Sequence, residues 1–388
     1  MPSIKLNLPA SVNKTETNLE EQDEFKKLAN YAQSIDDLLI FATEHDCSDL
    51  YITVREKPYI SRYGKIIELP CQEISESDWS TFYDAHVLQE QHAIYVREKH
   101  LDLSIEVHID SSNPNYNKVD IPIYRYRAAF GYGLSPEEAI KVNTATFRMI
   151  RPNKITFDTI NFNSKCVEAL RKAYSRSSGI CYCTGPTGSG KSTTLAACIN
   201  TFTQKNEILD NKVIITLEDP IENLFYNTSS VKITQKEYGR DFLTFGNGIK
   251  AALREHPNVI VVGECRDKEV ICTAIEASRT GHLTSTSFHA ADVPGTLNRL
   301  LYHLDNDKNL SLDLILQLNI IMSQKMIKQN DRYLVDTQFL VFDNQVIKRL
   351  VDVLNTTGNV AQEIEDMIKD PAYQELGLVK DWDYAHLH

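Results

Sequence analysis

The chain of 388 residues lacks several features that would assign it to a familiar class. It has no run of 18 consecutive apolar residues, and its first thirty residues hold no apolar core of the kind found in signal peptides. No C-x-x-C pair occurs among its eight cysteines, so the spacing favours reduced, mostly buried thiols over a zinc site or a disulfide framework. We therefore expect a cytoplasmic protein without direct membrane insertion.

Excess positive charge is also absent. Lysine and arginine total 41 against 53 aspartates and glutamates, for a formal net charge of -12. A protein that binds nucleic acid mainly through its phosphates needs clustered basic residues, so this balance argues against direct nucleic-acid binding, although it leaves room for a small basic channel. The length and an apolar content of 42% predict two domains, each with its own core.

The first 150 residues predict a flexible arm followed by a small α+β domain. Residues 1–20 are polar and indicate the arm, while residues 21–150 carry the domain. Apolar residues at helical spacing cover residues 24–45, and Ser75 with Asp78 marks the start of a helix that continues to about residue 98. Strands are expected at residues 49–54, 58–69 (with a turn at 63–65), 101–109, 121–132 and 145–150.

A linker at residues 151–163, which contains Pro152, leads to a second domain at residues 164–350. Apolar strands alternate with helices there, which predicts a mainly parallel sheet covered on both faces. We further expect a long apolar helix at residues 312–329 with Ser311 as its N-cap, a late strand pair within 334–342, and a helical tail at 351–388. The parallel strands are predicted at residues 179–184, 213–217, 259–262 and 283–287.

One stretch of the second domain has the spacing of a phosphate-binding loop: Gly185, Pro186, Thr187, Gly188, Ser189, Gly190, Lys191, Ser192 and Thr193. Glycines let backbone N–H groups turn toward an anion, Lys191 reaches the outer phosphates, and the hydroxyl of Ser192 is a ligand for Mg²⁺. A chance glycine-rich turn is the alternative, with a frequency of about 1–2% in chains of this length. The flanking strand and helix patterns favour nucleoside triphosphate binding.

Three further polar clusters each lie at the end of a predicted strand, where ligands gather in open α/β sheets. Glu218 ends one apolar run, and Glu264 follows the run at 259–262 in the position of a Walker B acid. Such carboxylates support Mg²⁺ and orient the attacking water. His282 and His289 bracket a third strand and are candidates to contact the γ-phosphate. A helix cap or a structural histidine explains each cluster taken alone, but their order behind a phosphate loop favours catalysis.

These four motifs, in this order, resemble those of the secretion-superfamily ATPases, which drive type II and type IV secretion and pilus assembly and retraction. The Walker A motif, Asp box, Walker B motif and His box of that family correspond to residues 185–193, 216–222, 259–267 and 280–289. The resemblance implies an α/β fold, with a PAS-like α+β domain followed by a RecA-like P-loop NTPase domain. It also implies a homohexamer that binds ATP and Mg²⁺ and hydrolyses ATP.

The resemblance implies roles for individual residues as well. Glu218 corresponds to the general base or water-positioning residue, Glu264 with Ser192 to the groups that support Mg²⁺, and His282 and His289 to the His-box pair.

Arg125, Arg127 and Arg148 fall where family members direct arginines toward the nucleotide. Independently of the family, Arg125 and Arg127 are two residues apart on a predicted strand and therefore share a face. A solvated strand face is the alternative interpretation of the pair.

Within the superfamily, the likeness is greatest to the DotB- and TraJ-like motors of type IVB secretion and conjugation, on the strings at residues 124–127, 263–267 and 339–343. The tetracysteine segment of type II assembly motors is absent, and residues 345–351 do not clearly copy the Ala-Ile-Arg-Asn-Leu-Ile-Arg element of retraction motors. We expect a cytoplasmic motor held at the inner membrane by the proteins of a secretion or conjugation complex. A pilus retraction ATPase and a nucleotide-gated scaffold with little turnover are the alternatives, ahead of a DNA helicase or translocase.

Overall fold

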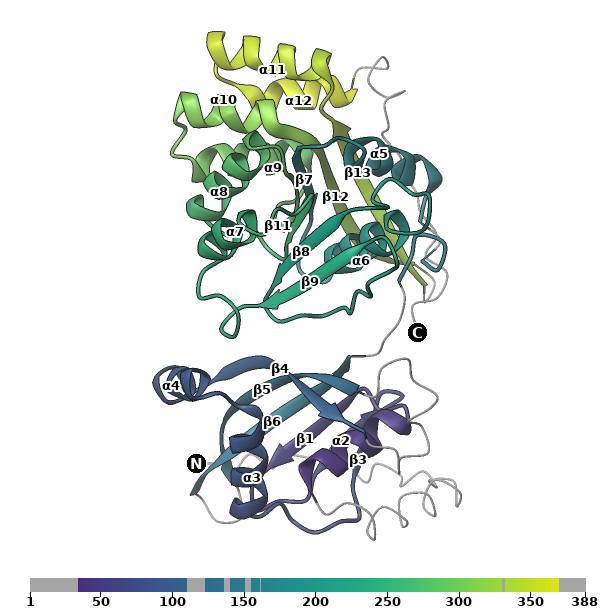
Figure 1. Ribbon diagram of the computed structural model, residues 1–388, viewed down its shortest axis with the longest axis vertical. Helices are drawn as coiled ribbons and strands as arrows, with labels where there is room; N and C mark the ends of the chain where they lie inside the picture. The colour runs from purple at the N-terminus through teal and green to yellow at the C-terminus, as the bar shows by residue number, and fades with distance from the viewer. Residues whose placement is uncertain are drawn as a thin grey trace, which may run out of the picture. The chain divides into compact units, whose positions relative to one another are not determined.

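The computed structural model describes residues 34–109, 123–135, 140–150, 155–160, 162–329 and 332–369. The chain divides into two compact units, Met1–Met149 and Ile150–His388, and each is described by itself (Figure 1). The predicted arm at residues 1–20 lies outside the described residues, as do parts of the first predicted helix and of the predicted tail. None of the helices in the described ranges combines the length and apolar composition needed to cross a membrane.

The N-terminal unit is a six-stranded sheet of order β3-β2-β1-β6-β5-β4, with three helices packed on one face. Alternation along β4 explains this arrangement, because Leu101, Leu103 and Ile105 enter the core while the residues between them stay outside it. The elements are α2 (Ile35–Glu44), β1 (Asp49–Thr53), β2 (Tyr59–Arg62), β3 (Lys65–Glu68), α3 (Glu76–His86), α4 (Gln89–Glu98), β4 (Leu101–His108), β5 (Ile123–Ser135) and β6 (Ile140–Ile150).

Two predictions for this unit have clear outcomes. The turn at residues 63–65 is confirmed, since Tyr63 and Gly64 take the positive φ values of 48° and 77° that a tight two-residue hairpin needs. The single helix expected over residues 75–98 is wrong, although Ser75 and Asp78 do form the capping box at its start. Val87 is extended, and the side chain of Gln91 accepts from the N–H of Leu88 at 2.9 Å, so a second helix begins there.

The C-terminal unit is a seven-stranded sheet of order β13-β12-β7-β11-β10-β8-β9, parallel except for β13. The four predicted parallel strands appear within one residue of their expected ends. The elements are α5 (Ser164–Tyr174), β7 (Gly179–Thr184), α6 (Lys191–Phe202), β8 (Val213–Glu218), β9 (Lys232–Glu237), α7 (Phe245–Leu253), β10 (Val259–Val262), α8 (Lys268–Arg279), β11 (Leu283–Phe288), α9 (Val293–His303), α10 (Lys308–Gln317), β12 (Leu318–Gln329), β13 (Arg332–Val341), α11 (Asn344–Thr356) and α12 (Val360–Lys369).

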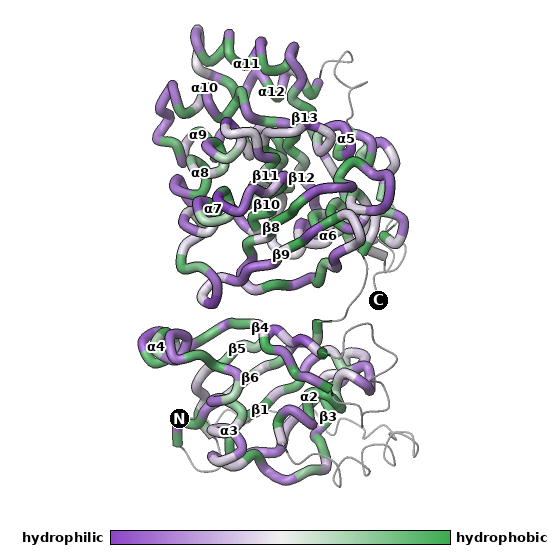
Figure 2. The backbone as a smooth tube through the Cα atoms, in the orientation of Figure 1, coloured by the Kyte–Doolittle hydropathy of each residue, from purple (hydrophilic) through white to green (hydrophobic). Residues whose placement is uncertain are grey.

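Helices cover both faces of this sheet (Figure 1). On one face α5 and α6 share a core with Cys181 and Cys183 of β7, and on the other face α7 to α12 share a core with Ile180 and Tyr182. The chain is correspondingly hydrophobic along β8 and β10, whereas α11 alternates between hydrophobic and hydrophilic residues (Figure 2). Since the central strands are buried on both sides, they show the continuous apolar runs that the sequence presents.

The predicted helix over residues 312–329 is wrong. Helix α10 begins after its N-cap Asp307, not Ser311, and ends at Gln317, and the chain continues as β12 between β7 and β13. Ile320, Ile321 and Met322 are each at most 1% exposed, because both faces of β12 are covered. A segment buried on both faces has no polar side, so its apolar spacing fits a helix as well as a strand.

Asn319, at the start of β12, fastens this strand to the start of β7. Its Nδ2 donates to the carbonyl oxygen of Ser178 at 3.0 Å, and its Oδ1 accepts from Nη1 of Arg176 at 2.9 Å. Gly179 has a φ of +121°, and a Cβ there would lie 2.2 Å from Nδ2 of Asn319. The contact therefore needs both a glycine in β7 and a short amide in β12.

We predict that Asn319→Ala lowers the free energy of unfolding by about 2 kcal/mol, because it leaves the partly buried carbonyl group of Ser178 and the guanidinium group of Arg176 without their partner. Urea unfolding followed by circular dichroism measures this change. The matched control is Ile327→Thr at an exposed position of the same strand, expected to change stability by no more than about 0.5 kcal/mol. Equal losses in the two variants would contradict the role given to Asn319.

Candidate functional site

The carboxyl ends of four parallel strands of the C-terminal unit meet at one edge of its sheet. The segments that follow β7, β8, β10 and β11 surround a cavity of about 490 Å³. Its lining includes Lys191, Glu218, Glu264 and His289, each from a different one of these segments. Because parallel strands all end at the same edge, the topology itself brings together side chains up to about a hundred positions apart.

The loop after β7 has the conformation of an anion cradle. Gly185, Gly188 and Gly190 take φ values of 150°, 75° and 86°, where other residues are strained. A Cβ at Gly185 would also lie 2.2 Å from the backbone oxygen of Gln324. No side chain caps the start of α6, so its first N–H groups are free to bind an anion, whose charge the helix dipole favours.

Lys191, the first residue of α6, places a positive charge in the cradle. Its Nζ donates to the carbonyl oxygens of Gly185 at 3.0 Å and Pro186 at 2.8 Å. Burial lowers the pKa of this ammonium from its usual value. A phosphate group that replaced these two carbonyl oxygens would gain a charge-assisted hydrogen bond from Lys191.

Gln324 of β12, which no local sequence pattern indicates, supports the cradle from the side. Its Oε1 accepts from the hydroxyl of Thr194 at 3.0 Å and from the thiol of Cys183 at 3.3 Å, while its Nε2 donates to the backbone oxygen of Ser189. The segment around Gln324 was expected to be helical, and a helix would not have placed this amide beside β7. If residues 332–341 are recognised as the second strand of a hairpin, the segment before them has to be the first strand, and Gln324 then lies on a strand.

Glu264, which follows β10, lies among charged groups. His289 Nε2 is 3.1 Å from one of its carboxylate oxygens, and Arg266 Nε is 2.7 Å from the other. Nη1 of Arg266 is also 3.9 Å from Asp219, and the hydrogen bond to Glu264 raises the pKa of Arg266. Asp267 instead caps α8 by accepting from the N–H of Val270 at 3.0 Å. The helix-cap interpretation thus holds for Asp267, while Glu264 faces the cavity.

Glu218, the last residue of β8, also lines the cavity. One of its carboxylate oxygens accepts from the hydroxyl of Thr216 at 2.7 Å and from Nε2 of Gln235 at 3.0 Å. Burial raises the pKa of Glu218 above the usual value, and these two hydrogen bonds act in the opposite direction. The sequence does not indicate Gln235 as a site residue either, because β9 is a polar edge strand without a run of apolar residues.

The two predicted histidines lie at opposite ends of β11. His289 follows the carboxyl end and contacts Glu264, whereas His282 precedes the amino end, about 20 Å away along the strand. The ring of His282 is hydrogen-bonded to the carbonyl oxygen of Ala277 at 3.1 Å. Within this chain, the structure therefore brings His289, but not His282, together with the phosphate loop.

The three predicted arginines belong to the N-terminal unit, where they share one face of the sheet. The register of β4 and β5 places Arg125 opposite Glu106, with Arg127 two residues on. Each arginine is paired with an acid of a neighbouring strand: Arg125 with Glu106 at 3.1 Å, Arg127 with Asp102 at 3.7 Å and Arg148 with Asp49 at 2.9 Å. Their role toward a nucleotide stays a prediction from the resemblance.

The donors in the cavity suit a magnesium ion that arrives with a nucleotide. They are the hydroxyl of Ser192 and the carboxylate of Glu264, both oxygen donors of the kind that Mg²⁺ prefers. The described ranges contain no group of three or more histidines, cysteines, aspartates and glutamates that would hold a metal by themselves. Magnesium bound mainly by phosphates and water needs only one or two protein ligands, so the residues present fit it.

Comparison with known proteins shows what the chain is similar to. A model of the Type II/IV secretion system protein family matches residues 26–349. The chain is 31% identical over 277 residues to a twitching motility protein of Neisseria gonorrhoeae, covering 71% of this chain and 66% of that one. It is 27% identical over 349 residues to the type IV pilus retraction ATPase PilT of Pseudomonas aeruginosa, covering 86% and 92%. The X-ray structure of the Legionella pneumophila ATPase DotB has a TM-score of 0.75 at 26% identity, covering 89% and 92%.

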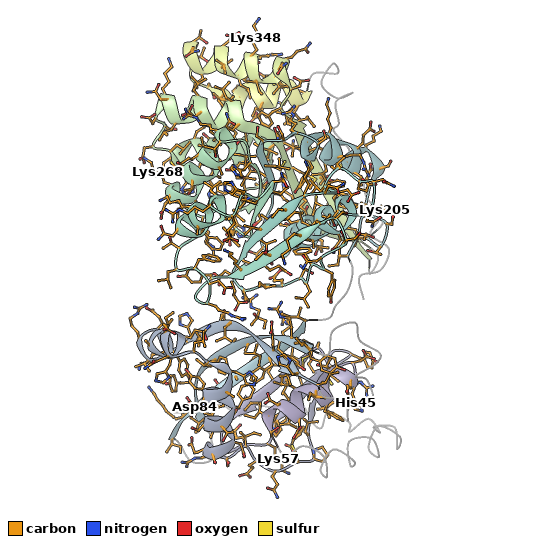
Figure 3. All side chains as sticks on the ribbon, viewed as in Figure 1. His45, Lys57, Asp84, Lys205, Lys268 and Lys348 are labelled. Carbon is orange, nitrogen blue, oxygen red and sulfur yellow. The ribbon has the colours of Figure 1, made fainter. Side chains whose placement is uncertain are left out.

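We predict that Lys191→Ala weakens the binding of a non-hydrolysable ATP analogue by about 10- to 100-fold, since charge-assisted hydrogen bonds to phosphate are lost. Titration calorimetry measures the dissociation constant. Lys205→Ala, at an exposed lysine on the periphery of the same unit (Figure 3), should bind like the unchanged protein. If Lys191→Ala bound the analogue as tightly as the unchanged protein, the loop at residues 185–193 would not be the phosphate-binding element.

Proposed function

Because the chain belongs to the type II/IV secretion system protein family, we propose that it is a homohexameric ATPase that powers a secretion or conjugation system of the type IVB class. One observation carries the proposal: a single cavity contains the phosphate loop with Lys191, the hydroxyl of Ser192 and the two carboxylates of Glu218 and Glu264. These are the groups that phosphoryl transfer to water requires. The motor would act at the inner membrane, held there by protein partners.

Each group in the cavity has a chemical task in this proposal. Lys191 and the start of α6 bind the β- and γ-phosphates, and Ser192 with Glu264 would hold a Mg²⁺ ion, which would supply charge neutralisation of the phosphates. Glu218 accepts a proton from the attacking water. Its raised pKa favours that task, since a general base works best when its pKa approaches the working pH. His289 and Arg266 hold the Glu264 carboxylate from both sides.

The choice of a type IVB system rests on finer observations. The DotB structure aligns over 89% of the chain with a TM-score of 0.75, and the strings at 124–127 and 263–267 resemble that group. Pilus retraction is the second candidate, because the PilT relative aligns over 86% of the chain. Residues 345–351, where retraction motors carry their basic element, form the first half of α11 and hold Lys348 and Arg349 as their only basic residues.

We predict that Glu218→Gln slows ATP hydrolysis by about 10²- to 10⁴-fold while the ATP analogue still binds, because the amide cannot accept the proton of the attacking water. Steady-state phosphate release and titration calorimetry measure the two properties. Glu365→Gln, at an exposed position of α12, is the control and should hydrolyse ATP at the unchanged rate. If Glu218→Gln hydrolysed ATP at the wild-type rate, Glu218 would be excluded as the base. If the unchanged protein did not hydrolyse ATP at all, the result would favour a nucleotide-gated scaffold.

The assembly is tested separately. We predict that the protein has the mass of six copies in solution when a non-hydrolysable ATP analogue and Mg²⁺ are present. Light scattering coupled to size-exclusion chromatography gives that mass. A monomer at every protein concentration, with the nucleotide bound, would contradict the ring.

A further inference from the structure

The strand at the edge of the sheet, β9, lies directly beside the proposed catalytic base. Strands β8 and β9 are parallel, and their register sets Thr216 opposite Gln235 and Glu218 opposite Glu237. Because side chains alternate along a strand, these four residues all point to the same face of the sheet. That face also carries Ile214 and Ile233, which pack in the core beneath α6. The edge strand thus presents two polar side chains to the end of β8.

Two donors converge on one oxygen of the Glu218 carboxylate. The hydroxyl of Thr216 donates to Oε1 at 2.7 Å, and Nε2 of Gln235 donates to the same atom at 3.0 Å. Thr216 is completely buried, and no other hydrogen bond of its hydroxyl is seen in the described structure. Two donors on one carboxylate oxygen fix the rotation of the group and favour its ionised form.

Gln235 also holds the loop that follows Glu218. Its Nε2 donates to the carbonyl oxygen of Asn223 at 2.7 Å, and its Oε1 accepts from the N–H of Phe225 at 2.8 Å. Together with the bond to Glu218, these contacts employ both N–H groups and the oxygen of the amide. Asn223 and Phe225 line the cavity, as Glu218 does. One partly buried amide therefore connects the carboxylate to the wall of the site.

We propose that Thr216 and Gln235 are positioning residues of the ATPase reaction, which hold Glu218 ionised and aimed while Gln235 couples it to the loop at residues 219–225. The inference rests on the proposed function, since it assigns Glu218 the role of base. Neither residue touches the nucleotide in this proposal. They act through the carboxylate, and their removal should change turnover and its pH dependence without weakening nucleotide binding.

Other charged groups face the same cavity and act on Glu218 from several elements. Glu222 acts in two ways, because its backbone N–H donates to the carboxylate of Glu218 while its own charge opposes ionisation. The titratable and charged groups on the cavity wall come from α6, from the loop after β8 and from the segments after β10 and β11: Lys191, Asp219, Glu222, Glu264, Arg266 and His289. Glu237 of β9 is buried beside them and accepts from the N–H of Ile221 at 3.2 Å. A substitution at Thr216 leaves all of these groups in place.

The deciding experiment compares Thr216→Val with Thr216→Ser in the full chain. Valine keeps the shape of threonine but donates nothing, so the pKa of Glu218 should rise, because the ionised form loses a donor. We expect the acidic limb of the plot of kcat against pH, where kcat rises as Glu218 loses its proton, to move to higher pH by about one unit. Serine keeps the hydroxyl and should return the limb to its wild-type position. The dissociation constant of the ATP analogue should stay within about twofold for both variants.

A second pair of variants tests the amide. Gln235→Glu keeps the size of the side chain and the acceptor for Phe225, but it replaces the donor with a second carboxylate next to Glu218. We expect kcat at pH 7 to fall by at least about tenfold and the acidic limb to shift upward as in Thr216→Val. Lys232→Gln, at the exposed first position of β9, is the control and should leave the acidic limb in place.

The outcomes separate this inference from the proposed function. If the unchanged protein hydrolyses ATP and Glu218→Gln does not, but the acidic limb of Thr216→Val coincides with that of the unchanged protein, the positioning role is wrong and the base assignment stands. If Glu218→Gln hydrolyses ATP normally, the base assignment itself fails. Melting temperatures of all variants are measured as well. If the shift of the acidic limb simply follows the fall in melting temperature from variant to variant, the positioning role is also wrong.

Discussion

The structure of the C-terminal unit depends on one constraint, the parallel pairing of β7, β8, β10 and β11. Strands in parallel register end at the same edge, so the phosphate loop and the residues after the other three strands have to meet there. The apolar side chains of these strands are buried between helices on both faces, which fixes the register and leaves the strand ends as the polar part of the unit. The location of the cavity is a consequence of this topology.

Polar groups at such an edge need partners, and two glutamines provide many of them. Gln324 of β12 holds the phosphate loop through Ser189 and Thr194, and Gln235 of β9 holds Glu218 together with the loop after it. Both amides come from strands on the flanks of the catalytic ones. Gln324 is fully buried and Gln235 partly buried, and an amide whose donors and acceptor are all used keeps its partners in a single arrangement. The flanking strands therefore determine how rigidly the cradle and the carboxylate are held.

The N-terminal unit has a different polar surface. Its helices cover the apolar face of the sheet, and the opposite face carries arginines paired with acids one strand away, such as Arg148 with Asp49. All three pairs are ion pairs within the unit itself, and that of Arg148 with Asp49 is also a hydrogen bond of 2.9 Å. If Arg148 left Asp49 for a phosphate, it would exchange one charge-assisted hydrogen bond for another.

The sequence by itself determined the parts that depend on local spacing. A few neighbouring residues are enough to predict the phosphate loop, the acids at the ends of β8 and β10, and the turn at Tyr63 and Gly64. Such local conformations require the same residue types in any fold. Only the tertiary structure decided that residues 318–329 form a strand, that Gln235 and Gln324 reach the site, and that His289 but not His282 lies beside Glu264. Those outcomes depend on which strands become neighbours, and that is settled by the burial of surfaces far apart in the chain, which no local pattern records.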